Sequence, residues 1–332
     1  MSKVKMAKRN DFWQRNRLSD GYLLKKTILN YALKILRFLL MFGLCFLILQ
    51  PILNKISVSI MATKDIFDST INVVPRNFST ENIRLAVYLM DYPSALTNSL
   101  LISLSISLVQ LISCTLVGYG FARFNFPFKK FLFACVILVI VIPPQTISTS
   151  LYLHFRYFDI FGIVSLINGD TANLRGSAIP YYLMSVGCMG LKNGLYIYLI
   201  RQFFRGIPKE LEEAAYVDGC GTLSTFFRIM LPDAKPILTS CFLFSFVWQW
   251  TDNFYSGMFL GKTKLLSTEL ESLADTLGNY LADGKGTQQV SVGYVQQINS
   301  IGTLLVVTPL ILLYLIAQRG FVESLSQTGI KM

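Results

Sequence analysis

The chain has 332 residues, of which 53% are hydrophobic and only 15% are charged. A soluble domain usually carries about 25% charged residues, so this composition excludes an ordinary soluble fold, a disordered chain and a disulfide-rich scaffold. The mean hydropathy of +0.50 indicates long apolar segments of the kind that cross a membrane. The formal net charge of +11 fits either nucleic-acid binding or basic cytoplasmic segments of a membrane protein, and the position of the charges decides between them.

The N-terminal segment is strongly basic. Ten of the first 37 residues are Lys or Arg, and only Asp11 and Asp20 oppose them. The apolar run that follows reaches Gln50 and Pro51 without a small-residue cleavage site, which is not the pattern of a signal peptide. We therefore expect a basic cytoplasmic tail over residues 1–35 and a transmembrane domain over residues 36–332.

Six segments are long and apolar enough to be membrane spans, because a span needs about 20 mostly apolar residues. These segments predict an all-α membrane protein with both termini on the same side. Their approximate bounds are 36–60, 96–120, 130–152, 178–202, 236–260 and 298–318.

The positive-inside rule orients these spans. If the N-terminus is cytoplasmic, the inside segments 1–37, 121–130, 201–235 and 319–332 hold 20 of the 30 Lys and Arg residues. We therefore expect a multi-pass protein of the cell membrane with both termini in the cytoplasm. The basic character follows from this topology, so no nucleic-acid partner is needed to explain it.

Catalytic and cofactor motifs are not apparent. The six cysteines form no CxxC pair and the chain has one histidine, so a metal site or a catalytic triad is not expected. The stretch "GMFLGKT" (257–263) resembles a phosphate loop but has three residues between its glycines, where that motif needs four. We expect neither catalytic residues nor a bound cofactor in this chain.

Several polar residues lie within the predicted spans, where exposure to lipid is costly. They are expected to face other helices or a water-filled path, and hydrogen bonding between helices accounts for most of them. The candidates for a solute path are Asn98, Gln145, Gln249 and Asp252.

The most informative segment, residues 203–235, lies on the predicted cytoplasmic side between the fourth and fifth spans. It predicts two short helices: Pro208 suits a first helical position, and three glutamates follow where the helix dipole favours acids. Gly219 permits a tight bend, and Pro232 is expected to end the second helix. Such a segment either fits a groove on a partner or lies on the bilayer as a connector.

The same segment resembles the EAA loop, "EAA---G---------I-LP", the signature of the integral-membrane subunits of ABC importers. We therefore call residues 203–235 the EAA loop. The resemblance implies that this loop couples the chain to an ATP-binding subunit. The matching residues are Glu213, Ala214, Ala215, Gly219, Ile229, Leu231 and Pro232, and Asp218 supplies the "DG" that the family commonly has.

The resemblance extends over nearly the whole chain to the maltose-type carbohydrate importers, and to the smaller of their two permease subunits. Supporting stretches include "PRNFSTENI" (75–83), "YGFARFNFPFKK" (119–130) and "QRGFVESLSQTGIKM" (318–332). It implies the type I ABC importer permease fold. It also implies four partners in the membrane complex and outside it: a second permease subunit, two ATP-binding subunits and an extracellular solute-binding protein. ATP is then bound and hydrolysed by the partners.

By analogy with the family, Glu213 pairs with a basic group on the ATPase, Ala214 and Ala215 allow close approach, and Gly219 makes the turn. Two alternatives stay open at this point. One is an ABC permease for a solute that is not a sugar. The other is a secondary transporter that works alone, although such proteins usually show internal repeats, and no clear repeat is present here.

Overall fold

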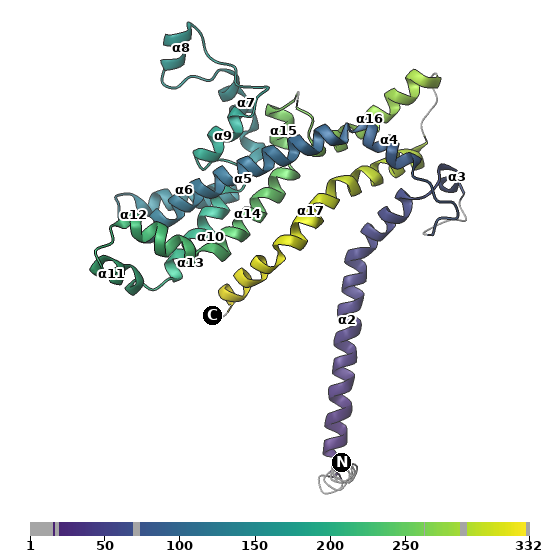
Figure 1. The fold of residues 1–332 in the computed structure, drawn as a ribbon, viewed down its shortest axis with the longest axis horizontal. Coiled ribbons are helices and arrows are strands. Elements are labelled where there is room, and N and C mark those ends of the chain that lie inside the picture. Colours follow the sequence, from purple (N-terminus) through teal and green to yellow (C-terminus); the bar gives the residue numbers. More distant parts are fainter. Residues whose placement is uncertain (1–15, 17–19, 69–73, 262, 286–290, 330–332) are drawn as a thin grey trace.

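The structure is a computed structural model that describes residues 16, 20–68, 74–261, 263–285 and 291–329. Helix α5 (Tyr92–Arg123) is its central element. It packs against α10 (Asn193–Gly206) and α14 (Lys235–Trp250), and the three helices lie side by side in Figure 1. Within the described residues, two isolated bridges between single residues are the sole β-type pairings. The expected all-α architecture is therefore confirmed.

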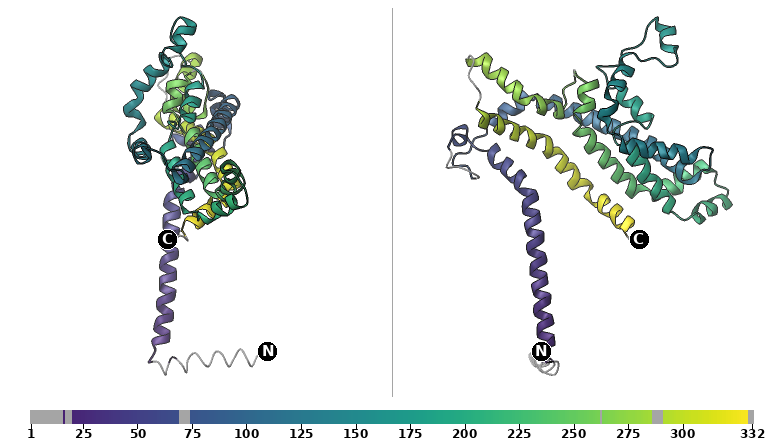
Figure 2. Two further views of the ribbon diagram at one scale, coloured as in Figure 1. Left: turned by 90° about the vertical axis from the view of Figure 1, so that its left-hand side faces the viewer. Right: turned by 180° about the vertical axis from the view of Figure 1, so that it is seen from behind.

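In the part of the chain that the structure describes, three helical stretches are each long and apolar enough to cross a membrane by themselves. They lie in α2 (Tyr22–Ser59), in α5 and in α17 (Val292–Gly329), whose stretch ends at Gln318. They contain the first, second and sixth predicted spans. In both views of Figure 2, most of α2 stands apart from the other helices. Near its C-terminal end it is fastened to α17, because the Gln297 amide donates to the carbonyl oxygens of Val58 (3.0 Å) and Met61 (2.6 Å).

The third predicted span is sharply bent. It consists of α6 (Lys129–Val141), a 3₁₀ turn (Pro144–Ile147) and α7 (Ser148–Arg156), and the helix axis bends by 101° between its two arms. The break falls where Pro143 and Pro144 follow Ile142, which is extended with ψ of 119°. A residue before proline disfavours the helical conformation, and proline itself donates no backbone hydrogen bond.

The fourth predicted span, 178–202, is not a continuous helix. It is divided into α9 (Ile179–Val186) and α10, and the segment between them contains left-handed residues at Cys188 (φ 57°) and Lys192 (φ 62°). The break is buried in protein: a Cβ added at Gly190 lies only 2.6 Å from the amide nitrogen of Gln110 on α5. Non-helical backbone at membrane depth is tolerated where protein covers it, which hydropathy alone does not reveal.

The segment that leads into the fifth predicted span also differs from expectation. It contains α12 (Thr222–Thr225), a π-helical turn (Phe226–Met230) and α13 (Leu231–Asp233), before a bend of 74° into α14. Pro232 therefore does not end the helix; it lies in the first turn of α13, where a missing backbone donor costs little. The bend comes at Ala234 instead, and α14 is followed by the short helix α15 (Phe254–Phe259).

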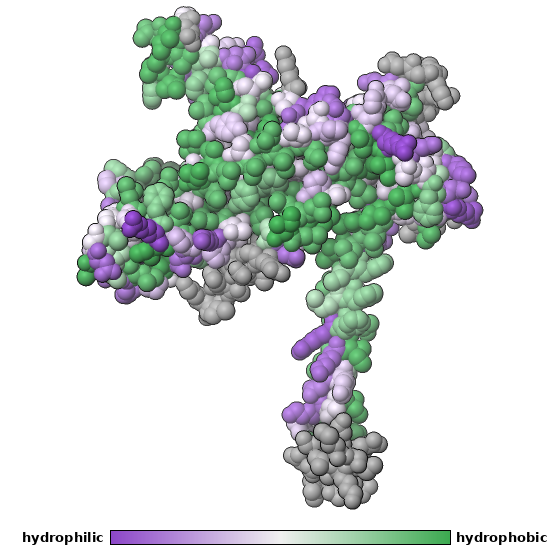
Figure 3. All heavy atoms as spheres, in the orientation of Figure 1, coloured by the Kyte–Doolittle hydropathy of each residue, from purple (hydrophilic) through white to green (hydrophobic). Residues whose placement is uncertain are grey.

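The remaining helices lie at the periphery of the bundle. α11 (Glu210–Val217) belongs to the EAA loop at one end. In Figure 1, α3 (Thr63–Ile66), α4 (Glu81–Leu89) and α16 (Leu266–Lys285) lie together at the opposite end, and α8 (Ile163–Asn168) projects separately beyond α7. Figure 3 shows hydrophobic side chains over the middle of the bundle and hydrophilic ones gathered toward the ends. This is the surface that a membrane protein presents.

Among the described residues, buried apolar side chains form three clusters. The first joins α5 and α10 to the EAA loop, and Phe204 and Met230 are fully buried in it. The second joins α4, α16 and α17 and includes the fully buried Leu273, and the third joins α7, α9 and α15 and includes the fully buried Phe259. α14 contacts the first cluster with its N-terminal half and the second with Trp250, so it links the two ends of the molecule.

Candidate functional site

The EAA loop begins in the last turn of α10, at the end of the bundle where α5 also terminates (Figure 1). α11 is closed by a glycine turn: the amides of Asp218 and Cys220 donate to the carbonyl oxygens of Ala214 (3.0 Å) and Ala215 (2.9 Å). Gly219, between them, has φ of +83°, a left-handed conformation that costs a residue with a Cβ. The turn therefore requires the glycine of the EAA match.

The matched residues of the EAA loop divide between its two faces. Ala215 is buried against the bundle, whereas Glu213 and Ala214 are exposed. The loop therefore presents one acidic and one small side chain outward from α11. Of the other matched residues, Asp218, Gly219 and Pro232 are exposed, and Ile229 and Leu231 are half-buried.

A buried ion pair joins the EAA loop to the end of α5. Arg123, the last residue of α5, places its Nε 3.3 Å from Glu212 Oε1, and the two side chains are only 6% and 10% exposed. The Tyr119 hydroxyl donates to the same carboxylate oxygen at 3.0 Å. Arg123 Nη2 also donates to the carbonyl oxygen of Ile207, at 2.9 Å. We call Tyr119, Arg123 and Glu212 the Arg123 clamp.

Aromatic rings pack beneath the Arg123 clamp. The Tyr119 ring lies edge-on to Phe204 of α10, with centroids 5.2 Å apart, and is tilted against Phe226 of the π-helical turn at 4.7 Å. Such aromatic contacts add to the stabilisation that area burial provides. α5, α10 and the EAA loop are therefore joined by a polar and an apolar contact at the same place.

Glu212 is not part of the EAA match, yet it is the glutamate of α11 that the fold buries. Its position has a local signal, since Glu212 and Ala215 are three residues apart and therefore share one face of the helix. Its partner Arg123 lies in the stretch "YGFARFNFPFKK", which the resemblance includes without a role. The spacing of Glu212 and Ala215 indicates which face of α11 is buried. It does not indicate that Arg123 is the side chain that contacts this face.

Asp252, a candidate for the solute path, is buried and fully engaged at the C-terminal end of α14. Its carboxylate accepts the Tyr181 hydroxyl at 2.5 Å and the amides of Ser256 (3.0 Å) and Tyr255 (3.3 Å). Its carbonyl oxygen also accepts the Ser267 hydroxyl at 2.7 Å. In this conformation Asp252 fastens α9, α15 and α16 together.

The other solute-path candidates have separate surroundings. Asn98, near the start of α5, donates to the carbonyl oxygen of Lys264 at 3.1 Å. Gln145 is exposed in the 3₁₀ turn after α6, and Gln249 is buried on α14. Among the residues that the structure describes, no group of three or more His, Cys, Asp or Glu is arranged to hold a metal ion.

Comparison with known proteins gives one family. Residues 114–327 match the family described as "Binding-protein-dependent transport system inner membrane component". The chain is 26% identical to the "Arabinooligosaccharides transport system permease protein AraQ" of Halalkalibacterium halodurans, over 90% of this chain and 97% of that protein. It is 27% identical to the "Trehalose transport system permease protein SugB" of Mycobacterium tuberculosis, over 85% and 92% of the two chains.

A solved structure shares the fold. The chain superposes on one chain of a bacterial ABC transporter "involved in the import of the acidic polysaccharide alginate" with a TM-score of 0.65 at 17% identity. The likeness covers 87% of this chain and 96% of that one. The chain therefore has an ABC importer permease fold.

Proposed function

Because the chain belongs to the family of binding-protein-dependent transport system inner membrane components, we propose that it is a permease subunit of an ATP-driven carbohydrate importer. The observation that carries the proposal is its similarity, over most of both chains, to permeases named for arabinooligosaccharide and trehalose transport. The chain is a multi-pass protein of the cell membrane. In the importer it forms half of the translocation pathway.

The EAA loop is the proposed contact with an ATP-binding subunit. Its outer surface carries apolar side chains that water does not favour, and exposed apolar patches commonly mark protein interfaces. Glu213 lies beside them and supplies a negative charge for a basic group on the partner. The exposed apolar side chains are Leu211 (47%), Val217 (86%), Leu223 (74%) and Phe227 (58%).

The Arg123 clamp provides a route from that contact into the membrane domain. A movement of α11 is passed to α5 through Glu212 and Arg123, because a buried ion pair resists separation of its partners. In this proposal, ATP is bound and hydrolysed by two partner subunits. This chain binds no cofactor and catalyses no reaction; it converts closure of the ATPases into movement of its helices.

A second permease subunit and an extracellular solute-binding protein complete the proposed importer. The exposure of α2 supports this proposal, because none of the residues in its most apolar stretch is buried within the chain. Such a stretch needs another apolar surface to cover it. Phe38, Phe42 and Ile48, for example, are 67%, 62% and 70% exposed. Membrane lipid and a second permease are the surroundings in which such side chains are stable. The binding protein delivers the solute at the opposite end.

The test is to purify the tagged chain gently from its native membrane, identify the attached subunits and measure ATP-driven sugar uptake in vesicles. We expect an ATP-binding subunit and a second permease to accompany it. Gly219→Trp should abolish uptake while the chain still inserts, because the bulky side chain and the lost turn both disturb the proposed ATPase contact.

Gly176→Trp is the matched control. Gly176 has the same φ of +83° as Gly219, and a Cβ added at either glycine meets nothing within 4 Å. Both substitutions therefore strain the backbone similarly, but Gly176 lies outside the EAA loop. Normal uptake by Gly219→Trp removes the coupling role. Recovery of the chain alone, still moving solute without ATP, contradicts the importer proposal as a whole.

A further inference from the structure

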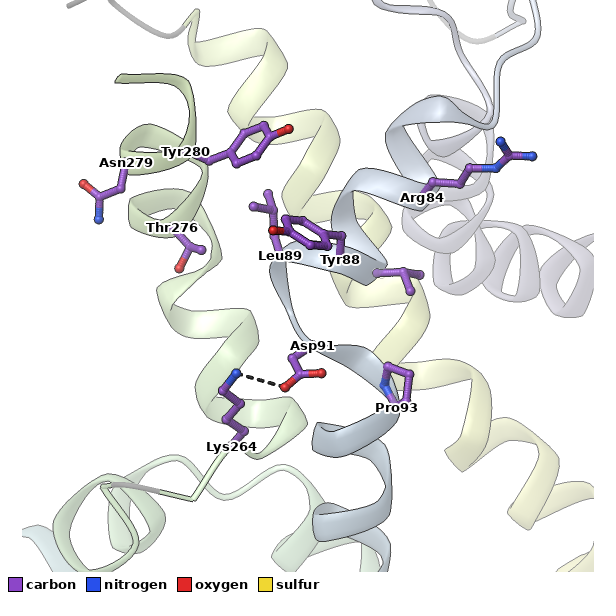
Figure 4. A pocket seen from close by; sticks show the side chains of 10 residues that line it. Arg84, Tyr88, Leu89, Asp91, Pro93, Lys264, Thr276, Asn279 and Tyr280 are labelled. Carbon is purple, nitrogen blue, oxygen red and sulfur yellow. Dashed lines mark hydrogen bonds and ion pairs between the residues drawn. The ribbon is translucent and has the colours of Figure 1, made fainter. Parts of the chain in front are cut away.

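A pocket of about 720 Å³ lies between α4 and α16 (Figure 4). These two helices lie at the end of the bundle opposite the EAA loop (Figure 1). Its volume is within the range of roughly 300–1,000 Å³ that is usual for small-molecule sites. The helices that wall it carry charged residues such as Glu81 and Glu271, which place it outside the hydrocarbon layer. By the expected topology, this is the extracellular side.

The two walls present the same pattern of side chains. On α4 the pocket is lined by Arg84, Val87, Tyr88 and Leu89, and the first three have the spacing of a set of three on α16. Positions i, i+3 and i+4 share one helix face, so these sets each lie on one face of their helix. Each set of three ends in a tyrosine. The α16 set is Thr276, Asn279 and Tyr280.

The two tyrosines are exposed and close together. Tyr88 and Tyr280 are 70% and 47% exposed, and their ring centroids are 6.1 Å apart with the planes at 64°. In Figure 4, Tyr280 projects from α16 toward Tyr88 across the pocket, whereas Arg84 points away from both rings. An aromatic face left in water at a pocket wall is available to stack against a ligand.

Polar groups form the other end of the pocket. Lys264 donates to Asp91 at 2.9 Å (Figure 4), and Ser94 donates to the second oxygen of the same carboxylate at 3.0 Å. The Asn98 side chain holds the carbonyl oxygen of Lys264 at 3.1 Å, and the Leu266 amide donates to the Ser99 hydroxyl at 2.8 Å. These bonds fix the Lys264 segment to the first turns of α5, and the ion pair cancels its own charge.

The α16 wall is held along its side. Leu266, Leu273 and Leu277 are fully buried on the face of the helix that adjoins the pocket face. α17 approaches that face closely, since a Cβ added at Gly302 lies 2.6 Å from Leu273 Cδ2 and 2.9 Å from Leu270 Cδ1. The pocket is therefore formed before any ligand arrives, which lowers the entropy cost of binding.

We propose that this pocket is a binding site for a neutral oligosaccharide at the outer end of the permease. The apolar C–H face of a sugar ring stacks on Tyr88 or Tyr280, and its hydroxyl groups bond to the Asp91–Lys264 pair, Thr276 and Asn279. A neutral ligand matches a site whose central charges are already paired. The assignment rests on the proposed carbohydrate import and adds a sugar site on this subunit itself.

The experiment measures sugar binding to the full chain in lipid nanodiscs by saturation-transfer-difference NMR and titration. The probes are maltotriose, raffinose and arabinotriose. At least one probe is expected to bind, and Tyr280→Ala should weaken its binding about tenfold, which corresponds to the loss of one good aromatic contact. Tyr280→Phe should bind like the wild type, because the stacking face is retained.

Tyr157→Ala is the matched control, because Tyr157 is 56% exposed and lies outside the pocket. Gel filtration of each variant verifies that the fold is kept. The proposal is overturned if none of the three probes binds, or if Tyr280→Ala binds as tightly as the wild type. If sugars do not bind but Tyr280→Ala weakens attachment of the solute-binding protein, the pocket is a protein contact and the sugar assignment is wrong.

Uptake by the assembled transporter separates this proposal from the one on which it rests. Sugar uptake without binding at the pocket overturns the proposed sugar site but not the proposed carbohydrate importer. ATP-driven uptake of another solute, without uptake of any sugar, overturns both. Uptake together with binding that Tyr280→Ala weakens supports both.

Discussion

Helix α5 has an ion pair at each end, and the two pairs differ in their exposure. At the end that meets the EAA loop, the inner end, Arg123 and Glu212 are 6% and 10% exposed. The Glu212 carboxylate also accepts a hydrogen bond from the Tyr119 hydroxyl. At the outer end, Lys264 and Asp91 are 53% and 42% exposed. The Lys264–Asp91 contact is the shorter of the two, at 2.9 Å against 3.3 Å for Arg123–Glu212. The distance therefore does not indicate which pair contributes more to stability.

Burial is what separates the two pairs. Removing one partner of a buried pair leaves a charge without water or a counter-charge, which costs several kcal/mol. An exposed pair loses little, because water solvates each charge after separation. The inner pair is therefore suited to transmitting force between the EAA loop and α5. The outer pair is open to water, so it is suited to hydrogen-bonding a neutral ligand while its two charges stay paired.

Loss of Arg123 should have the largest effect. Arg123→Ala leaves the Glu212 carboxylate buried without its cation and is expected to cost on the order of 3 kcal/mol of stability. Hydrogen exchange of the α11 amides and thermal unfolding of the detergent-solubilised chain measure this. Arg205→Ala, at an exposed arginine of α10, is the control and should change neither. Equal effects of the two substitutions would contradict a special role for the Arg123 clamp.

The contact between α5 and α10 near the inner end gives the second prediction. A Cβ added at Gly118 lies 2.8 Å from Ile200 Cγ2 and 3.2 Å from the Arg201 backbone nitrogen, so Gly118→Ala should destabilise the chain by about 1–3 kcal/mol. Gly120→Ala has open space and should stabilise it by up to about 1 kcal/mol through helix propensity. Unfolding temperatures that move in opposite directions support the close crossing.

Gly219→Ala tests the turn of the EAA loop with a smaller change. The φ of +83° is unfavourable for alanine, and nothing crowds the added Cβ, so we expect a cost of roughly 1–2 kcal/mol from backbone strain alone. Gly221→Ala is the comparison, because Gly221 has an ordinary φ of −76° and open space. Thermal unfolding should register the first variant and not the second; equal melting temperatures would remove the strain argument.

The outer ion pair should give the smallest effect and respond to salt and acid. The ammonium of Lys264, and then the Ser94 hydroxyl, hold the pKa of Asp91 below its ordinary value. A depressed pKa means that the pair stabilises the fold above about pH 4 and loses that contribution as the pH falls below it. Salt at 1 M should also screen it. Lys264→Gln should therefore lower the unfolding temperature slightly at neutral pH in low salt, and not at 1 M salt.

The inner pair provides the contrast for this last experiment. Its side chains are shielded from solvent, so 1 M salt should leave the effect of Arg123→Ala nearly unchanged. A similar salt response of the two variants would mean that burial does not distinguish the two ends of α5.

Much of the EAA loop is visible in the sequence because its signals are local. The acidic first turn of α11 and the glycine turn at Gly219 involve residues within a few positions of one another. Pro232 shows the limit of the same approach. A proline in a sequence usually predicts the end of a helix, but the first turn of a helix tolerates it. Pro232 lies in such a first turn, and the bend is at Ala234.

Some features of the membrane-spanning segments can be predicted from the sequence and others cannot. α2, α5 and α17 are predicted by long apolar runs. The division between α9 and α10 is not predicted in this way, because hydropathy sums over a window and registers no break. That break exists where Gly190 meets Gln110 of α5, a residue far away in the sequence.

The sequence by itself determined the membrane class, most of the apolar helices and the position of the EAA loop, because each depends on neighbouring residues. Only the tertiary structure decided which glutamate of α11 is buried, that Arg123 is its partner, and that α4 and α16 turn their tyrosines toward one pocket. These are pairings between distant segments, and burial, which sets their energy, depends on how the helices cross.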